Sequence, residues 1–413
     1  MNKNILSLKA IYLLAAFLLS TAHLSAVNPF AQAKKDLRTI NDYLRMPDHG
    51  GINAQDFRTA LARVGLSLAA IIAITAGGAV VGYKIIKTKS QRGKIQKALL
   101  QAINDDDLES VKTVLEEQAN ATICDKKGNS LLMLAIANGK ENIIQYLLTI
   151  KDIDINAQNN EGSTALIEAI EKNNATLVTQ LINKGANVNI ADKNGFTPLI
   201  MATINAKNAI ATELINNGAD INAQNNEGDT ALIRAIKNND KDKVLLLINN
   251  NANVNQINKK GESPLISASR YGLSLDTIDL LLEKGALINA QDNNGWTALM
   301  WAIDQNEQKI AESLIKKEAN VNLANKTGET PLMKAASKGL VDLIELLLTN
   351  KAIINAVDHK GKTALMYAAE KGKPDAVSLL IKNHANVTIK SKEHKTAKDY
   401  AVNIATEQAL NLH

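Results

Sequence analysis

Very few residues of this 413-residue chain have the types and spacing that catalysis or metal binding requires. The single cysteine, Cys124, has no histidine placed by the sequence to activate it as a nucleophile, and it cannot form an intrachain disulfide. No phosphate-binding GxxxxGK[ST] motif and no GxSxG motif occurs. The six histidines show no metal-ligand or acid–base spacing: His23, His49, His359, His384, His394 and His413. We therefore predict a protein that is not an enzyme, with no cofactor, no metal and no small-molecule substrate.

The composition points to a thin helical protein. Aromatic residues make up only 3% of the chain, and Ala, Leu and Ile supply most of its apolar side chains, which suits stacked helices better than a large globular core. The net charge of +5 is small for this length and argues against nucleic acid as a partner. Asn, Lys and Ile are abundant, which is typical of proteins from AT-rich genomes.

A short motif recurs along the C-terminal three quarters of the sequence. It consists of a glycine, a variable residue, a threonine or serine, and an apolar run that ends on alanine, as in GSTALIEA (162–169) and GWTALMWA (295–302). Successive motifs are 33 or 34 residues apart, and this fixed period predicts an array in which each unit packs on the next. The Ser/Thr positions are 130, 164, 197, 230, 263, 297, 330 and 363.

This pattern resembles the ankyrin repeat, whose signature is T-P-L-H-x-A with a period of 33 residues. The resemblance implies an all-α ankyrin-repeat solenoid, with helix-turn-helix units joined by β-hairpin loops. The histidine of the signature is replaced by Ile or Met in the later units, so apolar packing must take over from its hydrogen bonds. The expected domain is 95–413, with an N-terminal cap at 95–124, eight full repeats (units 1 to 8) at 125–390 and an atypical C-terminal cap at 391–413.

Each conserved letter of the unit has a physical role. An Asp or Asn three residues before the glycine favours a tight turn, and the glycine permits a positive φ. The Thr or Ser is expected to cap the first helix, the alanine to allow close helix approach, and the later Leu-Leu or Leu-Ile pair to be buried. A recurring asparagine is expected to bond the backbone of its own hairpin: Asn156, Asn189, Asn222, Asn255, Asn289, Asn322 and Asn355.

Two apolar segments precede the array. Residues 1–26 begin with Lys3 and Lys9 and continue with the apolar run 10–22, which predicts a secretory signal peptide, with an uncleaved anchor as the alternative. A second run, Val64–Tyr83, has no charge across 20 residues and predicts a transmembrane helix. A buried core helix is the other interpretation of this run.

The charges that flank the second run predict its orientation. Arg58 and Arg63 precede it, whereas six basic residues and no acidic residue follow it within Lys84–Lys97. Positive flanks stay in the cytoplasm, so residues 27–63 are expected outside and the array in the cytoplasm. The basic segment 84–94 is interpreted as a juxtamembrane linker, and Lys84–Lys97 as a stretch that can hold anionic lipid head groups.

Two near-identical stretches identify the variable positions of the array. DINAQNNEGSTALIEAI (154–170) and DINAQNNEGDTALIRAI (220–236) differ only at Ser163/Asp229 and Glu168/Arg234. These two positions, just after the glycine and just before the alanine, vary in every unit while the framework is kept. We interpret them as positions where a partner touches the concave face.

The candidate binding residues come from these positions, and both tryptophans of the chain lie in one unit. Large aromatic residues are enriched among binding hot spots, although packing on the neighbouring unit would explain them equally well. The hypothesis is that aromatic and apolar residues anchor a protein partner and that cations select its charge. The anchors are Phe196, Met201, Trp296, Trp301 and Tyr367, and the cations are Arg234, Lys334 and Lys362.

The sequence therefore favours a membrane-anchored, non-enzymatic scaffold whose ankyrin solenoid binds a protein partner on its concave face. The alternative is a secreted ankyrin-repeat effector of an intracellular bacterium that acts on host proteins. A purely structural spacer is a third interpretation, which the varied and aromatic inner face makes less attractive.

Overall fold

The computed structural model describes residues 89–118, 123–205 and 208–411. The predicted signal segment 1–26, the segment 27–63, the apolar run Val64–Tyr83 and residues 84–88 lie outside the described residues. Among the helices that the structure describes, none is long and apolar enough to cross a bilayer.

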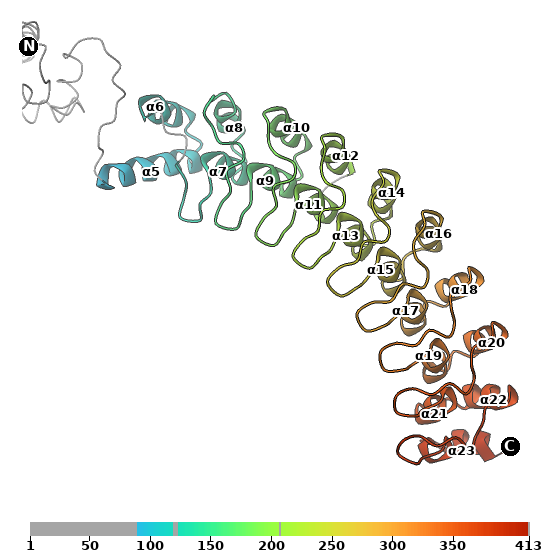
Figure 1. The fold of residues 1–413 in the computed structure, drawn as a ribbon. Helices are drawn as coiled ribbons and strands as arrows, with labels where there is room; N and C mark the ends of the chain where they lie inside the picture. Colours follow the sequence, from blue (N-terminus) through green and yellow to red (C-terminus); the bar gives the residue numbers. More distant parts are fainter. Residues whose placement is uncertain (1–88, 119–122, 206–207, 412–413) are drawn as a thin grey trace, which may run out of the picture. The chain divides into compact units, whose positions relative to one another are not determined.

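The described residues form a row of helix pairs, and no strand occurs among them (Figure 1). Each first helix contacts the first helix of the next unit, and the turns lie along the inner side of the curved row (Figure 1). The first helices of units 1 to 8 are α7 (Leu131–Ala137), α9 (Ala165–Glu171), α11 (Pro198–Asn205), α13 (Ala231–Lys237), α15 (Pro264–Arg270), α17 (Ala298–Asp304), α19 (Pro331–Lys338) and α21 (Ala364–Glu370). The second helices are α8 (Glu141–Leu147), α10 (Ala175–Asn183), α12 (Asn208–Asn216), α14 (Lys241–Asn249), α16 (Leu275–Glu283), α18 (Gln308–Lys316), α20 (Val341–Thr349) and α22 (Pro374–Lys382).

Atypical helices lie at both ends of this row. The N-terminal pair is α5 (Lys89–Asn104) and α6 (Leu108–Gln118), so α5 begins inside the stretch 84–94 that the sequence assigned to a linker. Lys, Gln and Arg are good helix formers and residues 89–94 contain no proline, so the helix extends toward the N-terminus. At the other end, the 3₁₀ turn η1 (Lys398–Tyr400) and α23 (Ile404–Asn411) complete the row, and His394 takes the positive φ (61°) of the missing glycine.

The turns are tighter than the predicted β-hairpins. In unit 3, the Asp192 carboxylate accepts the backbone N–H groups of Asn194 (2.9 Å) and Phe196 (2.8 Å), and Gly195 has a φ of 78°. Because the side chain satisfies these amides, little strand pairing is left. Among the described residues the turns contain only two isolated β-bridges, Cys124–Ser130 and Gln291–Thr297. The prediction of a β-hairpin in each unit is therefore wrong, because the described units have tight turns without paired strands.

Consecutive turns are joined by backbone hydrogen bonds. The N–H of Lys259 in unit 5 donates to the carbonyl of Glu227 in unit 4 at 2.9 Å, and equivalent bonds join the other turns from Lys127–Asn160 to Lys360–Lys392. A Cβ atom on Gly228 would lie 2.6 Å from the Lys259 nitrogen, so the glycine is required both for its φ of 77° and for this close approach.

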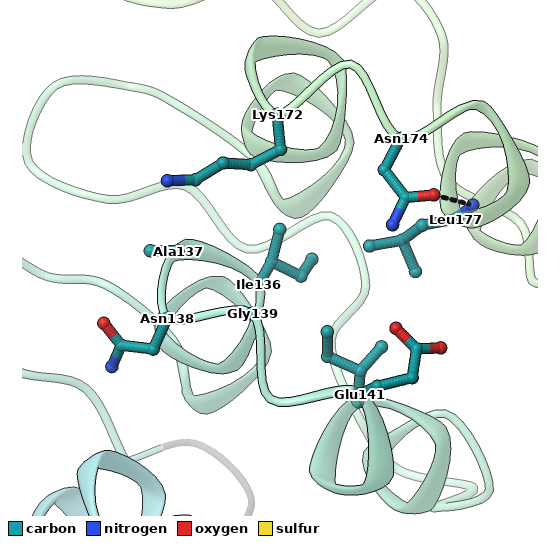
Figure 2. Close-up of a pocket in the computed structure, with 9 residues that line it drawn as sticks. Ile136, Ala137, Asn138, Gly139, Glu141, Lys172, Asn174 and Leu177 are labelled. Carbon is teal, nitrogen blue, oxygen red and sulfur yellow. Dashed lines mark hydrogen bonds between the residues drawn. The ribbon is translucent and has the colours of Figure 1, made fainter.

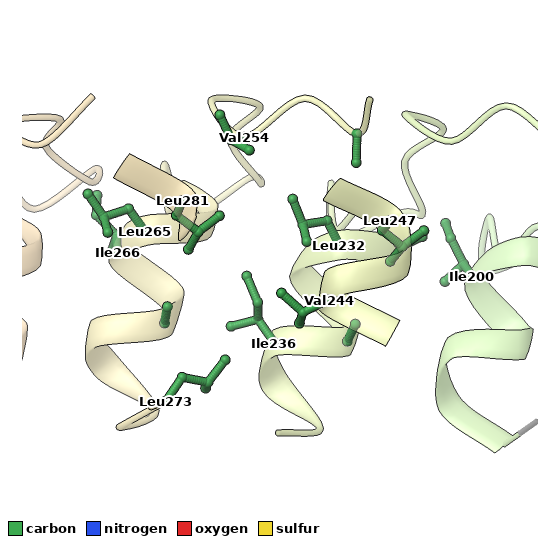
Figure 3. Close-up of a cluster of buried hydrophobic side chains, with 14 of the residues drawn as sticks. Ile200, Leu232, Ile236, Val244, Leu247, Val254, Leu265, Ile266, Leu273 and Leu281 are labelled. Carbon is green, nitrogen blue, oxygen red and sulfur yellow. The ribbon is translucent and has the colours of Figure 1, made fainter. Parts of the chain in front are cut away.

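The predicted helix caps and core residues are confirmed. In unit 4, Thr230 accepts the N–H of Ile233 at 3.2 Å, and each of the other units has the same Ser/Thr cap. Ala235 and Leu247 are fully buried, as is Ile233 at the position of the family's histidine. Figure 3 shows how apolar side chains of α11, α13 and α15 meet those of the second helices between units.

The recurring asparagines act between units and not within their own turn. Each carboxamide oxygen accepts a backbone N–H 31 or 32 residues further along the chain, at 2.7–2.9 Å. Asn189, for example, accepts from Asp220 (2.8 Å) and donates to the Gly218 carbonyl (3.1 Å). The prediction that these asparagines bond their own hairpin is therefore wrong, because the loop of the next unit lies closer to the carboxamide.

A second contact between units occurs only in alternate units. Gln224 donates from Nε2 to the Gly228 carbonyl of its own unit (2.5 Å) and to the Ile257 carbonyl of the next (2.9 Å), and Gln158 and Gln291 make the same pair of bonds. These glutamines lie in units 2, 4 and 6, which have Ala after the capping Thr, whereas units 3, 5 and 7 have Pro at that position. Units 2 to 7 therefore have a two-unit period in their contacts as well as in their sequence, whereas unit 8 has Val357 in place of the glutamine.

The asparagine contacts lead to a stability prediction. Replacing Asn189 by Ala removes both bonds to unit 4, and we expect the free energy of unfolding to fall by about 1 kcal/mol, because water can reach the backbone groups left behind. Urea unfolding of the full chain, followed by circular dichroism, measures the change. The matched control is Asn194→Ala at an exposed turn tip, where the side chain makes no hydrogen bond within the described residues. An equal fall in the free energy of unfolding of the two variants would contradict a stabilising role for the recurring asparagines.

Candidate protein-binding face

The two variable positions of a unit lie next to each other in space. One ends the turn and the other lies in the first helix, five residues later, so their side chains meet on the inner side of the array. Asp229 and Arg234 approach to 3.5 Å, Glu329 and Lys334 to 2.7 Å, and the Trp296 and Trp301 rings to 4.6 Å between centroids. The variable residues therefore contact each other in several units, whatever partner they bind.

This pairing explains the difference between the two near-identical stretches. In unit 4, the fully buried Asp229 carboxylate pairs with Lys237 (2.7 Å) and Arg234 (3.5 Å) and accepts the Asn258 amide of unit 5 (2.9 Å). In unit 2, Ser163 lies 3.5 Å from Glu168 instead. The two letters changed together because they are neighbours. The interpretation that a partner touches this position is wrong for Asp229, since no surface of that side chain is exposed.

A tryptophan cluster is centred on unit 6. We define it as Trp296 and Trp301 of unit 6, Arg270 of unit 5 and Lys334 of unit 7. The Arg270 guanidinium lies 4.2 Å from the Trp301 ring centroid, and the Lys334 ammonium lies 4.5 Å from that of Trp296. The Trp301 indole donates to Asp292 Oδ2 at 3.0 Å. Cations over indole faces are attracted by the ring quadrupole, so the cluster joins residues of units 5, 6 and 7 into one rigid group.

Tyr367 joins unit 8 to unit 7. Its hydroxyl lies 2.8 Å from Asp358 Oδ2 and 3.0 Å from Glu329 Oε1, and it donates toward these carboxylates. Burial raises the pKa of Tyr367 far above its ordinary value of 10, and the hydrogen bond to Asp358 and the charge of Glu329 raise it further. The phenol therefore stays neutral and serves as a donor at physiological pH.

Two glutamates of this face have opposite pKa shifts. Burial acts to raise the pKa of the Glu329 carboxyl, but hydrogen bonds from Lys334 and Asn325 and the charge of Lys334 outweigh it, and the pKa falls below its ordinary value of 4.5. For Glu168, burial raises the pKa above 4.5, and the neighbouring charge of Glu171 adds to this. The ionised carboxylate is thus stabilised in unit 7 and disfavoured in unit 2.

The remaining predicted residues are also held by internal contacts. Arg234 lies over the Phe196 ring at 5.7 Å, which joins units 3 and 4. Met201 is largely buried, and so is Lys362, whose ammonium pairs with Glu370 at 3.0 Å and lies 4.4 Å from the Tyr400 ring centroid. The structure thus brings together Trp296, Trp301 and Lys334, with Tyr367 reaching the same carboxylate as Lys334, while Phe196 and Arg234 form a separate pair.

A groove of about 430 Å³ opens beside the tryptophan cluster, across the turns of units 6 to 8. Two of the predicted residues line it, Trp296 and Tyr367. Its other lining residues come from the turns themselves, and the sequence did not single them out as binding residues: Asn294, Asn325, Lys326, Thr327, Glu329, Asp358, His359 and Lys360. The sequence could have indicated these positions, because the two residues that follow the Asp or Asn of each turn vary between units and lie at the tip of the turn.

A second hollow, of about 320 Å³, lies at the other end of the first helices, between units 1 and 2 (Figure 2). Its floor is apolar, with Ile136, Ile144 and Leu177, and Asn174 at its edge caps α10 by accepting the Leu177 N–H at 3.0 Å. No residue that the sequence singled out lines this hollow. Within the described part of the chain, no group of three His, Cys, Asp or Glu side chains could hold a metal ion.

Comparison with known proteins agrees with this architecture. A family model described as ankyrin repeats (3 copies) matches residues 99–192, 169–258, 242–325 and 318–391. The chain belongs to the ankyrin-repeat family. Ankyrin repeats imply a scaffold for protein–protein interaction and are in general not enzymes.

The similarity to individual relatives is confined to a short region. M-phase phosphoprotein 8 from Homo sapiens and from Mus musculus is 38% identical over 82 residues, which are 19% of this chain and 9% of each relative. The Rattus norvegicus protein is 38% identical over the same length, or 10% of its own chain. The chain thus spans about a tenth of the length of these relatives.

The two glutamates give a prediction about pH. Because the folded-state pKa of Glu329 lies below 4.5, its ionised carboxylate stabilises the fold at neutral pH, and this contribution is lost as the pH falls through the folded pKa. Glu329→Gln should cost about 1 kcal/mol at pH 7, the upper end for a partly exposed ion pair, and nothing once the wild-type carboxyl is protonated.

Glu168→Gln should have the opposite sign. Its folded-state pKa lies above 4.5, so the ionised carboxylate destabilises the fold at pH 7, and the wild type recovers stability as the pH falls through that pKa. Urea unfolding of both variants between pH 7 and about pH 3 measures the effects, since the contribution of Glu329 is lost only below pH 4.5, with Glu161→Gln at an exposed turn tip as the control. Changes of the same sign in the free energy of unfolding of Glu329→Gln and Glu168→Gln at pH 7 would contradict the opposite pKa shifts of these two glutamates.

Proposed function

We propose that the chain is a membrane-tethered interaction scaffold that binds a protein partner in the groove beside the tryptophan cluster. The observation that carries the proposal is the groove of about 430 Å³ lined by Trp296 and Tyr367. Aromatic side chains in partly desolvated pockets dominate the energy of many interfaces. Each ring is held by a residue of unit 7, Trp296 by the Lys334 ammonium and Tyr367 by a hydrogen bond to Glu329, so little conformational entropy is lost when a partner binds.

The other predicted residues take supporting roles in this proposal. Trp301, Arg270 and Lys334 hold Trp296 in place, and Phe196, Met201 and Arg234 form a smaller anchor in units 3 and 4. Arg234, Lys334 and Lys362 were predicted to select a partner's charge, but each is paired with an internal carboxylate, so we assign them mainly to positioning the rings.

The tether is proposed from the sequence alone. Val64–Tyr83 has the length and composition of a membrane-spanning helix, and the excess of Lys and Arg after it favours a cytoplasmic array. The same basic residues, Lys84–Lys97, would lie against anionic lipid head groups.

A second candidate is a secreted effector of an intracellular bacterium. The basic start and apolar run of residues 1–26 are compatible with export, and the abundance of Asn, Lys and Ile suits an AT-rich genome. In that case the array would meet its partner in a host cell, and recovery of the protein from host cytosol or culture fluid would distinguish the two candidates.

Binding in the groove predicts the effect of removing one ring. We expect Trp296→Ala to weaken binding of a captured and purified protein partner by about tenfold or more, because the exposed face of the indole is lost from the interface. The control is Leu287→Ala, which removes an exposed apolar side chain from the loop after α16. Affinity is measured by titration of the full-length chain, with circular dichroism to verify the fold. A Trp296→Ala variant that folds and binds as the wild type does would remove the groove from the proposal.

The proposed topology can be tested at the single thiol. Cys124 is exposed in the turn of unit 1, so a membrane-impermeant maleimide can reach it wherever the array faces the reagent. We expect labelling only after the cells are permeabilised, which is the result for a cytoplasmic array. Labelling of intact cells would overturn the topology and favour an array that lies outside the cytoplasm.

A further inference from the structure

The cations at and beside the variable positions are paired with carboxylates of the array itself. Arg234 and Lys237 pair with Asp229, Lys334 with Glu329, and Lys362 with Glu370. Arg270 pairs with the buried Glu262 and lies over Trp301. A partner that reaches the floor of the groove therefore meets rings and satisfied ion pairs, and little free charge.

The lysines at the turn tips are different. Each lies in the two residues after the turn Asp or Asn, or after Ser391, which takes that place in the C-terminal cap. Each is exposed and forms no ion pair or ring contact among the described residues. Their backbone groups take part in the hydrogen bonds between turns, so the tips are rigid although the side chains are free. The eight residues are Lys126, Lys127, Lys193, Lys259, Lys260, Lys326, Lys360 and Lys392.

These lysines are concentrated in the C-terminal half without opposing charge. At the tips of units 5 to 8, from Lys259 to Lys360, there are four lysines and His359, with asparagines in unit 6 and no acidic residue, whereas the tip of the C-terminal cap carries Lys392 beside Glu393. The N-terminal half alternates in sign, because Glu161 and Glu227 lie at the tips of units 2 and 4. We call the turn-tip residues Lys259, Lys260, Lys326, His359 and Lys360 the basic ridge, and the last three of them line the groove with Trp296 and Tyr367.

We propose that an acidic, extended polypeptide segment of a partner binds along the basic ridge, with an apolar side chain in the groove over Trp296 and Tyr367. Carboxylates of the segment meet Lys326 and Lys360 beside the groove, and further carboxylates meet Lys259 and Lys260 toward the N-terminal side. This inference rests on the proposed function and specifies the chemistry of the partner. Complementary charge of this kind speeds association and excludes basic competitors.

Other polyanions fit the ridge less well. A membrane surface is flat, whereas the turns follow the inner side of a curved row (Figure 1). Nucleic acid carries a phosphate every few ångströms and is usually met by dense Lys and Arg. The ridge has no arginine and no cation at all in the turn of unit 6.

The test selects 16-residue peptides from a random display library on the full-length chain. The charge-reversal variant is Lys326→Glu with Lys360→Glu, and the matched control is Lys126→Glu with Lys127→Glu, which changes the charge equally in unit 1. We expect enriched peptides to carry Asp or Glu around an apolar residue. Their affinity should fall about tenfold in the ridge variant and stay within twofold in the control, as exposed charges at an interface rim are each worth a modest amount. Binding should also weaken with added salt.

The other outcomes separate this inference from the proposed function. Neutral or basic peptides that bind the groove and are weakened by Trp296→Ala would overturn the acidic partner while keeping the scaffold. No enriched peptides, or peptides indifferent to both Trp296→Ala and the ridge variant, would overturn both. Single-stranded DNA or phosphatidylserine vesicles that displace the peptides and bind more tightly than they do would overturn a polypeptide as the occupant of the ridge.

Discussion

Each unit of this array can bury its apolar residues only against the next unit, and the rest of the structure depends on that contact. A pair of short helices has too little interior of its own, so Ile233, Ala235 and Leu247 become buried only when units 3 and 5 lie on either side. The motif glycines set how closely the units approach, because any side chain at Gly228 would meet the backbone of Lys259. The recurring asparagines and the glutamines of units 2, 4 and 6 then form hydrogen bonds with backbone groups of the next unit's loops.

The same close approach accounts for the chemistry of the variable positions. A charged residue at the end of a turn is partly or fully covered by its own first helix and by the next turn, so it needs a partner nearby. Asp229 finds Lys237, Arg234 and Asn258, and Glu329 finds Lys334, Asn325 and Tyr367. Variation at these positions is therefore constrained in pairs, and a change at one favours a compensating change five residues away.

The sequence was sufficient to predict what is local or strictly periodic. The Thr caps, the glycines at positive φ, the buried alanines and the apolar replacement of the family's histidine all follow from one unit read by itself. The partner of Asn189 could not be read in this way, because a one-dimensional period does not say which loop of the neighbour lies nearest the carboxamide. Burial of Asp229 was missed for the same reason, since its cover comes from Asn258 in the next unit.

Internal pairing also determines where recognition of a partner's charge can take place. Arg270, Lys334 and Lys362 are engaged by carboxylates or rings, and separating them would leave a partly buried carboxylate without its partner. Arg270 and Lys334 can orient Trp301 and Trp296, and Lys362 lies against Tyr367 and Tyr400, but all three are poorly placed to follow changes in a ligand's charge. The turn-tip lysines can be changed without disturbing any contact of the described array, because only their backbone groups hold neighbouring turns together. In the proposed binding mode, the aromatic rings of the groove supply affinity and the unpaired turn-tip lysines supply specificity, so the turn tips are where the array could change partners while its fold stays the same.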